Sequence, residues 1–195
     1  GAGYIFTEEN DSNVMHNSAL INLNIAKEVV KKNVKKVFYS SSACIYPKYN
    51  QLDSQNPKCA EDSVYPAMPD SEYGWEKLFS ERFYLAANRN YGLEIRIARF
   101  HNIFGPEGSW CDGREKAPAA MCRKVAENPD GGEIDMWGDG EQTRAFSYIG
   151  DISPQIANCV NVPEAYGEII NLGADKEYSV KTLATEVMKA MDFKE

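Results

Sequence analysis

The stretch KKVFYSSSACIYP, residues 35–47, contains a short apolar run that changes abruptly into small hydroxyl residues. The run 37–39 predicts a buried strand, because parallel strands that are covered on both faces are apolar along their length. The serines at 40–42 predict the point at which this strand opens into a loop that faces a ligand. We therefore expect a functional site at the carboxyl end of the strand.

Helical and strand patterns alternate along most of the chain. Between residues 13 and 32, for example, apolar residues recur at spacings of three and four, which is typical of a helix with one buried face. This order predicts an α/β fold, a doubly wound parallel sheet with helices on both faces. The expected helices are 13–32, 70–90, 121–126, 151–162 and 179–191, the strands 35–42, 93–100, 134–138 and 168–173, and the long loops 46–70 and 101–115.

The N-terminal stretch GAGYIF, residues 1–6, bears on whether the sheet is complete. A complete Rossmann fold places a Gly-rich phosphate loop directly after its first strand. Here no strand pattern precedes the glycines, and Phe6 stands where the third glycine belongs. We expect a flexible loop at 1–6 and a partial Rossmann-like sheet that lacks the N-terminal Gly-rich half, in a chain that is a fragment of a longer one.

The charge balance argues against two classes of partner. The formal net charge of −8 disfavours nucleic acid and anionic membrane surfaces, because both select proteins with basic faces. No apolar run reaches the roughly 18 residues of a membrane span, and no secretory signal pattern opens the chain. We therefore expect a cytoplasmic location.

Cysteine and histidine usage indicates neither a disulfide framework nor a metal site. The five cysteines are odd in number, widely spread and never spaced as Cys-x-x-Cys. The two histidines, His16 and His101, are far apart in the sequence. We expect reduced thiols and no bound metal.

Tyr73 and Lys77 stand four residues apart in the helix expected over 70–90. At this spacing both side chains lie on one helix face, so the ammonium can approach the phenol. A neighbouring cation lowers the pKa of a tyrosine from its usual value of about 10, which favours a phenolate base. Exposed helical pairs of this kind are common, so the pair alone is a weak signal. The strand end at 40–42 and the stretch RFHNIFGP, residues 99–106, are expected to converge with the pair on one site, which favours a functional role.

A resemblance to a known family rests on several stretches in a fixed order, namely SSSACIYP (40–47), YGWEK (73–77), RFHNIFGP (99–106), REKAPAAMCRK (114–124) and WGDGEQTR (137–144). Together they resemble the extended short-chain dehydrogenase/reductase family of NAD-dependent nucleotide-sugar epimerases and dehydratases. The resemblance implies NAD as cofactor and a nucleotide sugar as substrate. It also implies a homodimer formed through the first long helix and the helix that carries Tyr73.

The same resemblance implies a division of the chain and a set of site residues. Residues 1–110 resemble the C-terminal half of an NAD-binding Rossmann-like domain, and 111–195 a mixed segment with part of a substrate domain and returning strand and helix elements. The implied catalytic residues are Tyr73, Lys77, Cys44 and Lys116. The implied cofactor-binding residues are Asn17, Ser41, Tyr73, Lys77 and His101. The implied substrate-binding residues are Ser42, Cys44, Asn102, Glu115, Lys116, Lys124, Gln142 and Arg144.

Within the family, Cys44 and Lys116 resemble the branch that inverts both C3″ and C5″ of the hexose of GDP-mannose. If NAD first oxidises C4″, the new ketone acidifies the hydrogens on both neighbouring carbons. A thiol and an amine on opposite faces of the ring then supply the base and the acid. We expect the pKa of Cys44, usually about 8.5, to be lowered by the nearby lysine.

Two other interpretations stay open at this point. In the first, the protein is a 4-epimerase or reductase of another nucleotide sugar, and Cys44 has no catalytic role. In the second, it is a non-catalytic remnant domain. Because the phosphate-binding loop is missing from the sequence, we also expect the isolated chain to bind NAD poorly and to be inactive.

Overall fold

The computed structural model describes residues 2–52 and 58–194. Its helices are α1 (Ala2–Ile5), α2 (Asp11–Lys31), α3 (Glu72–Tyr91), α4 (Ala117–Ala126), α5 (Ile149–Asn161) and α6 (Val180–Ala190), and its strands are β1 (Lys36–Ser42), β2 (Glu94–Phe100), β3 (Asn102–Phe104), β4 (Thr143–Tyr148), β5 (Ile169–Leu172) and β6 (Glu177–Ser179). The expected mixed α/β fold with a parallel sheet is confirmed, and five of these helices match expected ones closely or in part.

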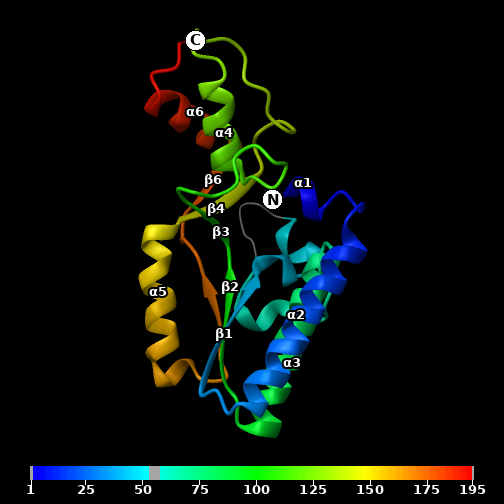
Figure 1. The fold of residues 1–195 in the computed structure, drawn as a ribbon. Helices are drawn as coiled ribbons and strands as arrows, with labels where there is room; N and C mark the ends of the chain where they lie inside the picture. Colours follow the sequence, from blue (N-terminus) through cyan, green and yellow to red (C-terminus); the bar gives the residue numbers. More distant parts are fainter. Residues whose placement is uncertain (1, 53–57, 195) are drawn as a thin grey trace.

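The central sheet has the strand order β1-β2-β5, and all of its strands are parallel. Helices α2 and α3 lie side by side on one face of the sheet, and α5 covers the other face (Figure 1). The register pairs Lys36 with Glu94 and Ser42 with Phe100, so β1 and β2 end together. Their carboxyl ends therefore form one edge, as the sequence predicts.

The two faces of the sheet follow the alternation of side chains along each strand. Tyr39, Ile95 and Ile97 pack into a buried cluster beneath α2 and α3. Ala98 and its neighbours on the opposite face pack against Ile152 of α5. Because both faces are covered, the strands are apolar on both sides, which explains the continuous apolar run at 37–39.

Helix α3 has clear signals at both ends. Ser71 precedes it, and its hydroxyl accepts a hydrogen bond from the backbone N–H of Gly74 at 3.2 Å. Gly92 ends it in the left-handed conformation, with φ of 66°. The serine satisfies a free N–H in the first turn, and the glycine adopts this φ without a steric penalty. These two residues fix where Tyr73 lies along the helix.

A second sheet has the order β3-β4-β6, with β3 parallel and β6 antiparallel to β4. The strand expected over 134–138 is not formed, because positive φ angles at Gly131, Gly132 and Gly138 turn the chain on both sides of it. β4 was not expected. Its buried side chains, Ala145 and Ser147, are small or polar and give no apolar alternation to detect.

Two further expectations need correction. Residues 2–5 form the short helix α1 rather than a flexible loop, and β3 lies within the loop expected over 101–115. In the long loop 46–70, the described residues include short 3-10 helices over Lys48–Gln51 and Glu61–Val64, and residues 53–57 lie outside the described part. Among the described helices, none is long and apolar enough to span a bilayer. The division near residue 110 stays a prediction.

A buried ion pair joins α3 to the central sheet. The guanidinium of Arg99 on β2 donates to both carboxylate oxygens of Glu81 on α3, with N–O distances of 3.0 and 2.9 Å. The Ser41 hydroxyl on β1 donates to the same carboxylate at 2.5 Å. The guanidinium also donates to the hydroxyl of Tyr46 at 3.1 Å and to the carbonyl of Glu61 at 2.8 Å. One buried pair thus ties two strands, a helix and the long loop together.

We predict that Arg99→Met lowers the free energy of unfolding by about 3–5 kcal/mol, because it leaves the Glu81 carboxylate buried without its cation. Replacing both partners by apolar residues should recover much of this loss. The matched control is Arg82→Met. Arg82 lies on the exposed side of α3, the helix of Glu81, and this variant should lower the free energy of unfolding by no more than about 1 kcal/mol. Urea unfolding is the measurement. Equal destabilisation by the two single variants would contradict the prediction.

Candidate active site

The carboxyl end of β1 leads directly into a short 3-10 helix over Ala43–Ile45. The hydroxyl of Ser42 accepts a hydrogen bond from the backbone N–H of Cys44 at 3.2 Å and caps this turn. The last strand residue and the cysteine therefore have a fixed relative position. This turn lies at the strand end where the sequence predicts a functional site.

Gly74 allows the first turn of α3 to pass directly against the backbone of Cys44. A Cβ atom at Gly74 would overlap the carbonyl oxygen of Cys44 and would lie 2.9 Å from the Cβ of Pro69. Real Cβ atoms do not approach backbone that closely, so a larger residue would force the helix and the turn apart. This close approach places Tyr73, the preceding residue, beside the cysteine.

Tyr73 and Lys77 lie on the same face of α3, as expected. The Lys77 ammonium is 5.7 Å from the centroid of the Tyr73 ring and 5.0 Å from that of Tyr39. It donates a hydrogen bond to the backbone carbonyl of Ser40 at 2.9 Å. The end of β1 thus holds the ammonium next to the phenol.

The expected acidification of Tyr73 does not occur in this structure. Burial raises the pKa of Tyr73 to about 12, and the negative charges of Cys44 and Glu76 act in the same direction. The hydrogen bond with Ser42 opposes this rise. Burial also lowers the pKa of Lys77. For both groups burial is the largest influence on the pKa, and the phenol is neutral near pH 7.

Cys44 shows the same balance. Burial raises the pKa of the thiol, whereas the hydrogen bond with Ser42 and the positive charges of Lys116 and Arg144 lower it. The expected effect of Lys116 is therefore present, but burial is larger and the net direction is upward. Although the Lys116 side chain is exposed overall, partial burial of its ammonium lowers its pKa. Burial thus shifts the pKa of each group in the direction of its neutral form.

Three of the residues expected to bind substrate are Glu115, Arg144 and Asn102. One carboxylate oxygen of Glu115 is buried and has no hydrogen-bond partner among the described residues, and the other lies 3.6 Å from the Arg123 guanidinium. Arg144, on β4, acts electrostatically on Cys44. Asn102 begins β3, directly beyond the end of β2. An unpartnered buried oxygen at Glu115 suits a site that receives a ligand.

Three residues expected at the cofactor have partners within the chain. The hydroxyl of Ser41 donates to Glu81 and belongs to the buried ion-pair network. The His101 backbone N–H donates to a carbonyl of β5 at 3.1 Å, and burial lowers the pKa of its ring. Asn17 is exposed on α2 and bonds to the ring of His16 at 3.1 Å. Their roles at a cofactor stay predictions.

Lys124 and Gln142 also bond elsewhere. The ammonium of Lys124 donates to the carbonyl of Asp135 at 2.5 Å, and the side-chain amide of Gln142 donates to the carbonyl of Trp137 at 2.8 Å. Both contacts hold the segment that was expected to form a strand. In this structure these two side chains support the loop beside the site, and their contact with substrate stays a prediction.

Sequence reasoning missed Asp70 as a residue of this site. Its carboxylate accepts a hydrogen bond from the Ser71 hydroxyl at 3.2 Å. Burial raises the pKa of Asp70, and the charge of Arg144 is among those that lower it. The Asp70 charge in turn raises the pKa of Cys44. The only sequence signal was its position three residues before Tyr73 in a loop.

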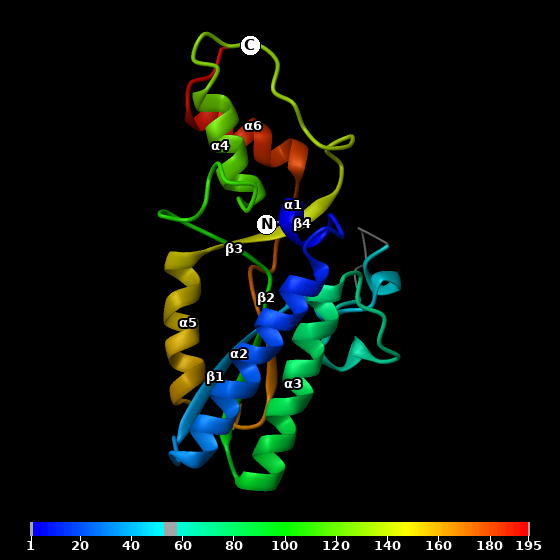
Figure 2. The ribbon, with the colours of Figure 1, turned by 45° about the vertical axis from the view of Figure 1, so that its right-hand side comes forward.

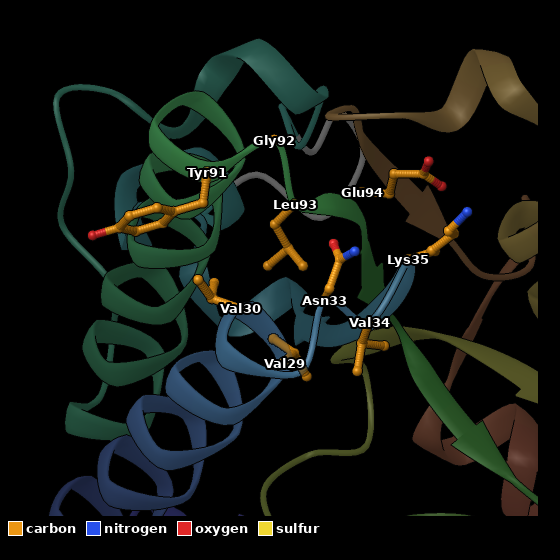
Figure 3. Close-up of a pocket in the computed structure, with 9 residues that line it drawn as sticks. All are labelled: Val29, Val30, Asn33, Val34, Lys35, Tyr91, Gly92, Leu93 and Glu94. Carbon is orange, nitrogen blue, oxygen red and sulfur yellow. The ribbon is translucent and has the colours of Figure 1, made fainter.

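Two pockets lie apart from these side chains. One, of about 210 Å³, is formed at the opposite end of the sheet, where α2 and α3 end and β2 begins (Figure 3). Val30, Leu93 and Tyr91 are among its lining residues. The other, of about 430 Å³, lies between β4 and the first turns of α5. Neither contains the Tyr73, Lys77 or Cys44 side chains.

Solved structures show the same fold. The structure of the epimerase Mth375 from Methanothermobacter thermautotrophicus matches with a TM-score of 0.77 and 25% identity, over 90% of this chain and 49% of that one. The UDP-glucose 4-epimerase of Thermus thermophilus in complex with NAD matches with a TM-score of 0.72 and 20% identity, over 89% and 53%. The second likeness concerns the fold alone.

Sequence comparison gives the family. GDP-mannose 3,5-epimerase of Arabidopsis thaliana is 40% identical over 186 residues, which are 95% of this chain and 48% of that protein. The chain spans about half the length of the curated relatives it matches. The model of the NAD dependent epimerase/dehydratase family matches residues 2–173. With the Tyr73–Lys77 pair at the end of β1, this match shows that the chain belongs to the NAD dependent epimerase/dehydratase family, whose cofactor is NAD.

Proposed function

We propose that this chain carries the catalytic residues of a nucleotide-sugar epimerase that inverts C3″ and C5″ of GDP-mannose after transient oxidation at C4″. One observation carries the proposal. The first turn of α3 packs at Gly74 directly against the backbone of Cys44, so the Tyr73 phenol and the Cys44 thiol lie at the same strand end, close enough for the thiol to influence the pKa of the phenol. The 40% identity to GDP-mannose 3,5-epimerase of Arabidopsis thaliana supports the same substrate.

The oxidation step requires a proton acceptor and a cation beside it. Bound NAD would supply the acceptor for the hydride that leaves C4″. Tyr73 takes the proton of the C4″ hydroxyl in its phenolate form, which the positive charge of Lys77 favours and which burial opposes. Lys77 has three N–H donors, of which one bonds to the Ser40 carbonyl, so donors are left for the hydroxyls of the cofactor's ribose. The residues at the end of β1 therefore fit the nicotinamide riboside part of NAD.

Inversion requires an acid and a base on opposite faces of the sugar ring. The C4″ ketone makes the hydrogens at C3″ and C5″ acidic. Because burial raises the pKa of Cys44 and lowers that of Lys116, the thiol can give a proton and the amine can take one. In this proposal the two residues exchange protons with carbon, and Tyr73 acts only at the C4″ oxygen.

We predict that Tyr73→Phe lowers the rate of transient NADH formation by about a hundred- to ten-thousand-fold in the complete protein, because the ring is kept and the proton acceptor is lost. Stopped-flow absorbance with GDP-mannose and NAD measures this rate. Tyr91→Phe, at an exposed tyrosine in the last turn of the same helix, is the control and should be unaffected. An unchanged rate in Tyr73→Phe would remove Tyr73 from the mechanism.

We predict that Cys44→Ala and Lys116→Ala each abolish exchange of the C3″ and C5″ hydrogens with deuterated solvent, while NADH formation survives. NMR of GDP-mannose incubated with enzyme and NAD in deuterium oxide measures the exchange. Cys111→Ala, at an exposed cysteine, is the matched control.

The same experiment separates the two alternatives. A 4-epimerase passes a hydride out and back and places no deuterium at C3″ or C5″. That result with active wild-type enzyme would favour the 4-epimerase interpretation, which has support in the 31% identity to a putative UDP-glucose 4-epimerase of Methanocaldococcus jannaschii over 88% of this chain and 52% of that protein. Neither NADH nor exchange, with any nucleotide sugar, would favour the non-catalytic interpretation. The cytoplasmic location stays a prediction.

We further propose that a second copy of the chain covers the outer face of α2 and α3. Ile21 and Ile25 of α2 and Trp75 and Phe79 of α3 stand four residues apart in each helix and are 57, 45, 41 and 48% exposed. The two helices lie side by side (Figure 2). Large apolar side chains exposed on both of them suit a contact between subunits. A two-fold contact would pair this surface with the same surface of the second copy.

We predict that Phe79→Glu shifts the complete protein from dimer to monomer, because a carboxylate at the centre of an apolar interface loses its hydration. Size-exclusion chromatography with light scattering gives the mass. Met191→Glu, at an apolar residue just beyond α6 that is 42% exposed, is the control and should leave the mass unchanged. An unchanged dimer in Phe79→Glu would place the interface elsewhere.

A further inference from the structure

Glu76 is a buried carboxylate in the helix of the Tyr73–Lys77 pair, and the proposed mechanism does not use it. Its residue is 1% exposed. Within the described part of the chain, no basic side chain forms an ion pair with it. An unpaired buried charge costs free energy, so the residue needs a physical explanation.

The carboxylate is satisfied by hydrogen bonds from two helices. The Ser18 hydroxyl of α2 donates to one oxygen at 2.6 Å. The amide of Asn22, also on α2, and the hydroxyl of Ser80 on α3 donate to the other oxygen at 3.2 and 2.6 Å. All of these groups donate, which suits an ionised carboxylate because that form only accepts. The site is therefore built to hold a negative charge.

The hydrogen bonds of the Glu76 carboxylate lead through neighbouring side chains to an aromatic ring that also lies beside the Lys77 ammonium. The Asn22 side-chain oxygen lies 3.3 Å from the Tyr84 hydroxyl, which donates to it. The Tyr84 ring packs on the ring of Tyr39, with centroids 5.0 Å apart. The Lys77 ammonium lies 5.0 Å from the Tyr39 centroid on β1. The network and the ammonium thus pack around the same ring.

We propose that Glu76 is a positioning residue for the Tyr73–Lys77 pair: its buried carboxylate joins α2 to the first turns of α3 and supplies the fixed negative charge that keeps Lys77 an ammonium. The inference deepens the proposed function and rests on it for its catalytic meaning. Glu76 itself neither contacts substrate nor transfers a proton in this account.

The charged groups around Lys77 agree with this role. Burial lowers the pKa of Lys77, and the negative charge of Glu76 is the largest of the effects that raise it, ahead of Glu81 and Cys44. Glu81 is paired with Arg99, so its charge is compensated nearby. The remaining titratable neighbours are the phenols of Tyr73 and Tyr39, whose pKa values burial raises, so that both are neutral. Glu76 therefore carries most of the uncompensated negative charge.

The test is the titration of Lys77 in the protein without NAD. Protein labelled with ¹³Cε-lysine is followed by NMR as a function of pH, and Lys77→Arg assigns the signal. Glu76→Gln keeps the shape and removes the charge, and we expect the midpoint of Lys77 to fall by about one pH unit. Glu72→Gln, an exposed glutamate in the first turn of the same helix, is the matched control and should leave it unchanged. Glu76→Asp keeps the charge and should keep most of the midpoint.

An unchanged Lys77 midpoint in Glu76→Gln overturns the proposal. Should that variant not fold, Glu76→Ser, a smaller neutral side chain with a donor and an acceptor, gives the same measurement. If neither neutral variant folds while Glu76→Asp does, the carboxylate serves folding alone and the proposal is overturned.

A second measurement uses the active protein. Removing the Glu76 charge lowers the pKa of both Lys77 and Tyr73, and these two groups together set the acidic and basic limbs of the pH profile of NADH formation. Both limbs should move to lower pH, whereas a purely structural defect lowers the rate without moving them. If wild-type protein oxidises no nucleotide sugar, the proposed function fails, and the NMR titration still decides the role of Glu76.

Discussion

The buried pair between Glu81 and Arg99 is the interaction on which the site depends. It is the only place where α3, β1, β2 and the loop before α3 are joined by charged hydrogen bonds within the described residues. Both side chains are almost completely buried, at 1 and 3% exposure. A bidentate pair fixes direction as well as distance, so it restrains α3, the helix that carries Tyr73 and Lys77, against β2.

The space left at the end of the sheet is small, and that constraint governs its electrostatics. Gly74 lets α3 pass against the turn at Cys44 without any side chain between them. The close packing leaves Tyr73, Lys77 and Cys44 only partly exposed to water. Burial is consequently the largest influence on the pKa of each of these groups, and neighbouring charges only modify it.

Helix α2 contributes to the site without touching it. Its serine and asparagine donate to the carboxylate of Glu76, which lies one residue before Lys77. The same helix presents apolar residues on its outer side. In the proposed dimer, α2 and α3 would contact the second copy through their outer faces. The hydrogen bonds to Glu76 join the same two helices on their inner faces. In the proposed enzyme, assembly and the charge state of Lys77 would therefore share a structural element.

The sequence by itself determined the main helices and the parallel strands of the central sheet, and it predicted a site at the end of β1. Apolar runs, helical spacing and the serines after β1 depend on burial and backbone preference, which act locally. Only the tertiary structure decided β3, β4 and β6. In β4, for example, the buried residues Ala145 and Ser147 are small or polar, and the strand forms because it pairs with strands that are distant in sequence. Tertiary structure also decided the direction of the pKa shifts at Tyr73 and Cys44. The sequence shows which charges are near one another, but the water excluded from a side chain depends on how the whole chain packs around it.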